Sequence, residues 1–89
     1  MSKLVWDVWN TEHIKKHNVT VEEVEEIYKS PKITKKTYLN RTLILGKTKK
    51  NRFLTIVVST EKQIAPYVIS ARDMSKKERR YYNEQTKTD

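Results

Sequence analysis

Residues 41–60 read RTLILGKTKKNRFLTIVVST and decide the fold. Apolar residues, many of them β-branched, form two runs here, separated by the polar segment from Thr48 to Asn51. The pattern predicts two strands, over about 41–47 and 52–60, joined by a short connection. Both faces of the later strand are largely apolar, which is typical of a central strand. The alternating residues are Phe53, Thr55, Val57 and Ser59 on one face and Leu54, Ile56 and Val58 on the other.

Two further strands are expected on either side of this pair, over about 33–38 and 64–71. The connections to them are short, at Leu39-Asn40 and from Glu61 to Gln63. Short connections favour an antiparallel meander, because parallel strands need long crossovers. Pro66 has no N–H for a sheet ladder, so the start of the last strand should lie on an edge or at a bulge.

Helical signals precede the strands. Residues 4–6 can form a short opening strand. Asn10 is a good N-cap for a helix over 11–16, and Asn18 can adopt the left-handed conformation that stops it. Thr20 and Glu23 then form a capping box, with Val19 and Val24 placed for a hydrophobic staple. This second helix ends at Ser30-Pro31, since a residue before proline resists helical geometry.

A last helix follows the strands. Ser75-Lys76-Lys77-Glu78 is a second capping box, and the helix should run to about Glu84, leaving residues 85–89 as a frayed tail. We therefore expect an α+β fold, in which N-terminal helices and a C-terminal helix pack on a four- to five-stranded antiparallel sheet. Residues 1–89 should form a single domain with its core within about 5–84.

Size and composition limit the function. A chain of 89 residues has room for one small core. It contains no cysteine, which excludes disulfides and thiolate metal sites. Its apolar runs are far shorter than the roughly 20 residues of a membrane span, and residues 1–3 begin no secretory signal. We expect a soluble, cytoplasmic protein with no membrane partner.

Charge is unevenly distributed. The net charge is +8, and residues 31–60 contain eight Lys or Arg and no Asp or Glu. Such a segment can attract a polyanion such as RNA. The alternative is a lysine-rich strand surface that prevents aggregation of sheet edges. One helix face is acidic in contrast, and it can either meet a basic partner or simply be solvated. Its residues are Glu22, Glu23, Glu25 and Glu26.

Few residues suit catalysis. His13 and His17 are spaced i, i+4, but a metal site would need further ligands, so no metal is expected. One of them can pack or hydrogen-bond while the other transfers protons near neutral pH. The single glycine, Gly46, excludes the glycine-rich phosphate loops, so no nucleotide cofactor is expected.

The densest polar cluster lies between Arg72 and Tyr82. A strand end followed by a capped helix start directs N–H groups and Arg side chains toward one region, which suits an anion. Metal-free RNA cleavage needs such cations, together with groups that accept and donate protons. The proton-carrying candidates are His13 or His17, Glu78 and Tyr82. The aromatic residues that can stack RNA bases are Trp6, Trp9, Tyr38 and Tyr67.

Three motifs resemble the BrnT-like toxin family. The first is Trp6-Asp7 with Asn10, His13-Ile14, Lys16-His17 and residues 19–26. The second covers Arg41 to Thr48, Arg52 to Leu54 and Val57-Val58. The third is Ile69 to Met74 with Lys77 to Tyr82. The chain departs from the family's usual pattern at Asn18, where Gly is common, and at Trp9 and Tyr67, near positions where relatives carry basic residues.

This resemblance implies a ribonuclease toxin of a type II toxin–antitoxin pair, with a fold related to the RelE toxins. It implies that RNA is cleaved without a metal ion. It also implies a cognate antitoxin protein that binds DNA, so the toxin contacts DNA only indirectly through its antitoxin. The catalytic residues transferred to this chain are His17, Arg41, Arg72, Glu78 and Arg79, with His13 and Tyr82 as second choices. The expected RNA-binding residues are Lys35, Lys36, Lys47, Arg52 and Arg80. The alternative is a non-catalytic RNA-binding or partner-docking module of the same fold.

Overall fold

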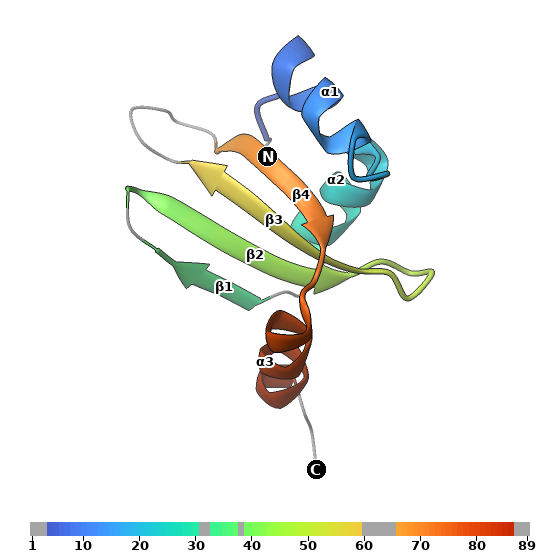
Figure 1. The fold of residues 1–89 in the computed structure, drawn as a ribbon, viewed down its shortest axis with the longest axis vertical. Coiled ribbons are helices and arrows are strands. Elements are labelled where there is room, and N and C mark those ends of the chain that lie inside the picture. The colour runs from blue at the N-terminus through green and yellow to red at the C-terminus, as the bar shows by residue number, and fades with distance from the viewer. Residues whose placement is uncertain (1–3, 31–32, 38, 60–65, 87–89) are drawn as a thin grey trace.

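The computed structural model describes residues 4–30, 33–37, 39–59 and 66–86 (Figure 1). Two helices come first, followed by four strands and a last helix. They are α1 (Val8–Lys15), α2 (Val21–Lys29), β1 (Ile33–Lys36), β2 (Arg41–Lys47), β3 (Phe53–Ser59), β4 (Tyr67–Asp73) and α3 (Lys76–Thr86). The α+β class and the order of elements predicted from the sequence are confirmed.

The strands form one antiparallel sheet in the order β1-β2-β3-β4, the predicted meander. β3 is a central strand as expected, and β4 lies on an edge and starts directly after Pro66. The expected opening strand is reduced to one parallel bridge between Val5 and Tyr67, in which the Val5 N–H donates to the Pro66 carbonyl at 2.8 Å. The described part of the sheet therefore has four strands.

Two helices cover one face of the sheet. Ile44 of β2 and Leu54, Ile56 and Val58 of β3 lie in the main core with the buried residues of α1 and α2. These helical residues are Ile14, Val24 and Ile27, each with no exposed surface. In Figure 1, α3 lies beyond β1 and β2, away from α1 and α2. The alternate residues of β3 point to α3, because Phe53 contacts Tyr82 and Thr55 contacts Glu78.

Close packing on the core face depends on Gly46. A Cβ atom at this position would lie 2.5 Å from Cγ2 of Ile27, which is closer than real Cβ contacts. Because Gly46 has no side chain, α2 can approach β2 closely at this position.

The start of α1 corrects one sequence prediction. Asp7, and not Asn10, is the N-cap, and the two residues form a capping box with bonds of 2.9 and 3.0 Å. Both residue types cap well, so composition alone could not choose between them. Asn10 is 2 % exposed, and its Nδ2 donates to the carbonyl of Val5. The predicted left-handed stop at Asn18 is confirmed, with φ at 59°.

The boundaries of α2 are those predicted. Thr20 and Glu23 form the capping box, Val19 and Val24 are buried, and Ser30 is the C-cap. Three glutamates of its acidic face are bound to other elements instead of being free for a partner. Glu23 accepts from Arg52, Glu25 from the Trp6 indole, and Glu26 from the Lys49 N–H.

The later boundaries differ slightly from expectation. β4 continues to Asp73 and α3 continues to Thr86, so Arg72 lies within the strand and residues 85 and 86 are helical. The Ser75–Glu78 capping box is present. Predictions for Tyr38, for the turn at residues 61–63, for the start of a strand at residue 64 and for the tail at 87–89 lie outside the described residues. No helix in the described ranges is long and apolar enough to cross a membrane.

Candidate functional site at the junction of strand 4 and helix 3

The strand register brings Arg72 onto the face of the sheet that meets α3. Arg72 is the antiparallel partner of Thr55, which in turn pairs with Leu45. β4 ends one residue later, and the chain passes through Met74 to Ser75, which caps α3. Glu78, three residues after the cap, is thereby turned back toward Arg72.

Arg72 and Glu78 form a two-bonded ion pair. Nη1 of Arg72 lies 2.7 Å from Oε1 of Glu78, and Nη2 lies 2.8 Å from Oε2. The carboxylate also accepts from the Thr55 hydroxyl at 3.0 Å and from the Ser75 N–H at 2.8 Å. Such parallel bonds fix the plane of a guanidinium as well as its position.

These donors determine the charge of both partners. Hydrogen bonds from Arg72 first, and then from Ser75 and Thr55, lower the pKa of Glu78 to about 2, although burial acts in the opposite direction. The pKa of Arg72 is raised, mainly by its hydrogen bond to Glu78. Glu78 is therefore an anion at neutral pH with all its donors in place, and it is better suited to holding Arg72 than to carrying a proton. The Arg72 side chain remains 38 % exposed, so an anion can reach it.

A second cation lies over an aromatic ring beside this pair. Cζ of Arg79 is 3.5 Å from the centroid of Phe53, and Nζ of Lys47 is 5.9 Å from the same centroid. Tyr82 packs edge-on against Phe53 with 5.8 Å between centroids, and it is only 9 % exposed. Tyr82 thus supports the Phe53 ring, while the exposed Arg79 is available to a ligand.

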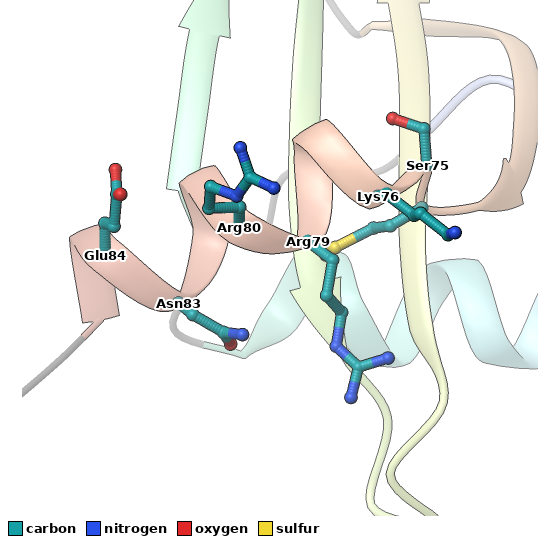
Figure 2. Close-up of a pocket in the computed structure, with 7 residues that line it drawn as sticks. Ser75, Lys76, Arg79, Arg80, Asn83 and Glu84 are labelled. Atoms are coloured by element: carbon teal, nitrogen blue, oxygen red, sulfur yellow. The ribbon is translucent and has the colours of Figure 1, made fainter.

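The outer side of α3 is hollowed into an open pocket of about 580 Å³. Figure 2 shows Arg79 and Arg80 leaving the helix in different directions. Three of the residues around this pocket are basic, although Glu84 is acidic. The lining residues are Met74, Ser75, Lys76, Arg79, Arg80, Asn83 and Glu84.

Of the predicted lysines, Lys35 and Lys47 lie on the same face, whereas Lys36 pairs with Thr42 and belongs to the opposite face. Nζ of Lys35 is 5.0 Å from the Tyr81 ring centroid, and Lys35 shares a smaller cavity of about 160 Å³ with Glu78. Lys36 and Arg41 are exposed at the other end of β1 and β2. Arg41 is four positions along β2 from Leu45, which is in register with Thr55 and Arg72, and this offset corresponds to about 13 Å. The structure therefore groups Arg72, Glu78 and Arg79 but not Arg41.

His13 lies on α1, which packs on the other face, and His17 lies in the turn that follows this helix. Their rings are 5.7 Å apart and both side chains are exposed. His17 is nevertheless connected to the site through its main chain, because Nη2 of Arg52 donates to the His17 carbonyl at 3.2 Å and Nε donates to Asp73 at 3.1 Å. His17 thus lies at the end of the sheet where β4 passes into α3.

Arg52 makes further bonds, to both carboxylate oxygens of Glu23 and to the Asn18 carbonyl. Its guanidinium therefore joins the α1–α2 connection to β3 and to the end of β4. These contacts support a structural role for this residue, which the sequence assigned to RNA binding.

Three residues of the site, Thr55, Ser75 and Phe53, were not predicted from the sequence. Ser75 was recognised as a cap but not as a donor to the Arg72 partner. Thr55 and Phe53 can be placed only with the register of β3 against β4, which shifts between Val57 and Val58. Among the described residues, no three His, Cys, Asp or Glu side chains gather in a way that could hold a metal ion.

Comparison with known proteins is consistent with this fold. Residues 6–78 match the family model described as the ribonuclease toxin, BrnT, of type II toxin–antitoxin systems. The structure is similar to the crystal structure of the ribonuclease toxin BrnT from Brucella abortus, with a TM-score of 0.66 and 20 % sequence identity. The similarity covers 85 % of this chain and 100 % of the Brucella chain. A search of curated proteins found no match.

Proposed function

Because this chain belongs to the BrnT family of ribonuclease toxins of type II toxin–antitoxin systems, we propose that it is an endoribonuclease that arrests growth. It acts in the cytoplasm, as a single domain, until a DNA-binding antitoxin neutralises it. It cleaves RNA with its own side chains and without a metal ion. The observation that carries this proposal is the partly exposed Arg72 side chain, whose guanidinium Glu78 holds by two hydrogen bonds on the face where Arg79 lies over Phe53.

The reaction suited to this site is attack of a ribose 2′-oxygen on the adjacent phosphorus. The 2′-hydroxyl loses its proton, the bond from phosphorus to the 5′-oxygen breaks, and that oxygen takes up a proton. The products are a 2′,3′-cyclic phosphate and a 5′-hydroxyl. Arg72 and Arg79 stabilise the negative charge that grows on the phosphoryl oxygens, a contribution that is large where donors are fixed in advance.

Glu78 acts in this proposal as a positioning residue for Arg72. Its low pKa and its four hydrogen bonds argue against a role in proton transfer. His17 is the proposed proton carrier, with His13 as the second choice, because the His17 main chain is joined through Arg52 to Asp73, the neighbour of Arg72. Arg41 contributes to RNA binding from the far end of the same sheet face, where Lys35 and Lys47 also lie. Lys36 contributes from the edge strand β1, and Arg80 contributes from α3.

One observation favours the alternative of a non-catalytic RNA-binding module. Glu78, the carboxylate in direct contact with Arg72, is a poor proton carrier, and Tyr82 is packed against Phe53. Substitution of His17 by Ala distinguishes the two functions. If the variant keeps its RNA affinity and loses cleavage, the enzyme is supported. A parent protein that binds RNA without ever cleaving it would establish the binding module.

Expression in bacteria tests the biological role. The gene is induced alone and together with its neighbouring gene, and growth and RNA integrity are followed. We expect arrest and RNA fragmentation from the gene alone and recovery when both are expressed. The proposal is wrong if the protein accumulates in folded form while growth continues and RNA stays intact.

A further inference from the structure

A second surface on α1 has features of a nucleic-acid site. Trp9 is 81 % exposed and Val8 is 75 % exposed, so the first turn of α1 presents a large apolar area to solvent. Exposed apolar patches of this kind commonly mark binding sites. The patch opens into a shallow cavity of about 280 Å³, which is lined by Val8, Trp9, Glu12, His13 and Lys16.

Three rings follow one another along this helix. Trp9, His13 and His17 are spaced four residues apart, which places them on one side of α1 and its C-terminal turn. The rings of His13 and His17 are in edge-to-face contact, and Trp9 and His13 line the same cavity. The helix and the turn after it therefore carry a row of three rings, and not a single exposed aromatic side chain.

The two charged residues that line this cavity are Lys16 and Glu12. Lys16 lines the cavity and is exposed. The carboxylate among the lining residues, Glu12, pairs with Lys15 at 3.3 Å. Aromatic rings beside cationic side chains suit single-stranded RNA, whose bases stack on rings while its phosphates meet the cations.

The other aromatic candidates in the described ranges are already engaged. The Trp6 indole donates to Glu25 at 2.7 Å, and the Tyr67 hydroxyl donates to the Asp7 carboxylate at 2.9 Å. Trp9 makes no hydrogen bond or ring contact of this kind in the described structure, so its indole face is free to receive a base.

We propose that α1 binds a segment of single-stranded RNA, with a base stacked on Trp9 and the adjacent phosphate held by Lys16 and His13. The proposal rests on the proposed ribonuclease function and adds to it a place where the substrate is bound outside the cleavage site. The row ends at His17, whose carbonyl Arg52 joins to Asp73, so RNA bound at Arg72 has to pass around this end of the sheet to reach α1.

The test measures binding of RNA that cannot be cleaved. A single-stranded oligonucleotide with 2′-O-methyl groups has no free 2′-hydroxyl, so affinity is measured without reaction. We compare the wild type with Trp9→Ala, Trp9→Phe and, as a control that removes apolar area from the same cavity without removing a ring, Val8→Ala. Both side chains, Val8 and Trp9, are exposed, and unchanged melting temperatures of the three variants verify the fold.

We expect Trp9→Ala to weaken binding by about tenfold or more, the usual effect of losing one stacked base. Trp9→Phe should lose less, and Val8→Ala should bind within about twofold of wild type. Equal RNA affinity of Trp9→Ala and wild type would overturn the proposal while leaving the ribonuclease function intact. A loss of affinity for the neighbouring gene's protein alone would identify a protein-docking surface and would equally overturn it. If the wild type does not bind this oligonucleotide, the proposal fails, and cleavage of unmodified RNA by the same protein then decides the ribonuclease function separately.

Discussion

At the scale of single residues, the central feature is a carboxylate whose role differs from the one its motif suggests. Glu78 lies in the closing motif beside two arginines, and as an acidic residue it was a candidate for proton transfer. In the structure it accepts four hydrogen bonds and its pKa is about 2. The capping box could be predicted from the spacing of Ser75 and Glu78 alone. The ion pair with Arg72 could not, because it depends on where β4 ends.

The pKa of Glu78 predicts a loss of stability in acid. The folded-state pKa lies below the ordinary value of 4.5, so the unfolded chain binds more protons between these values. The stabilisation from the Glu78 carboxylate is therefore fully present above about pH 5 and is lost as the pH falls toward 2. The free energy of unfolding should decrease by on the order of 2 to 3 kcal/mol over this range. Urea unfolding at a series of pH values measures this loss of stability.

Glu78→Gln cannot ionise, so its unfolding free energy should be lower than wild type at pH 7 and should fall less between pH 5 and pH 2. Glu22→Gln is the control, because Glu22 is exposed on α2. Parallel pH profiles of Glu78→Gln and wild type would show that the ion pair does not provide this stability.

At the scale of elements, local signals predicted the helices and the strands well. Capping residues and the residue before a proline act within a few positions, so the sequence contains them directly. The contacts between elements were harder to predict from the sequence. Three glutamates of α2 were interpreted as a solvated or partner-binding face, yet each binds a different part of the chain. Such long-range pairings require the packing of α2 against the sheet, which periodicity does not define.

The contact between β2 and α2 predicts a strong effect at Gly46. Gly46→Ala places a methyl group against Cγ2 of Ile27, so the helix must shift, at a cost of about 1 to 3 kcal/mol. Chemical denaturation measures this loss. Ile27→Ala removes Cγ2, and in its presence Gly46→Ala should cost much less. Additive effects of the two substitutions would show that the steric contact is not the cause.

The hydrogen bonds of Arg52 predict that its substitution lowers the stability of the fold without lowering the affinity for RNA. Arg52→Lys keeps the charge but cannot bind Glu23, Asp73 and two main-chain carbonyls at once, so unfolding should be easier by about 1 to 3 kcal/mol. Arg41→Lys, at an exposed position, should change stability by less than about 0.5 kcal/mol. A large fall in RNA affinity for the folded Arg52→Lys protein would instead support direct contact with RNA.

At the scale of the whole molecule, the positive charge of residues 31–60 belongs mostly to the sheet and its hairpin connections. The strand register places Lys35, Arg41 and Lys47 on the same face as Arg72, while the acidic helix α2 packs on the other face. A polyanion is therefore directed to the face that contains the Arg72–Glu78 pair. The sequence predicted this excess of charge, but its division between two faces required the folded chain.

Cleavage by the purified protein tests the central claim most directly. Wild type, Arg72→Ala and Lys29→Ala are incubated with RNA in the presence of EDTA, after unfolding curves have verified that each is folded. Lys29→Ala removes the same charge from the exposed end of α2, on the opposite side of the sheet. We predict cyclic-phosphate products from wild type and Lys29→Ala, and a rate at least about 100-fold lower for Arg72→Ala. Wild-type cleavage by folded Arg72→Ala, or no cleavage by any of the three proteins, would contradict the account.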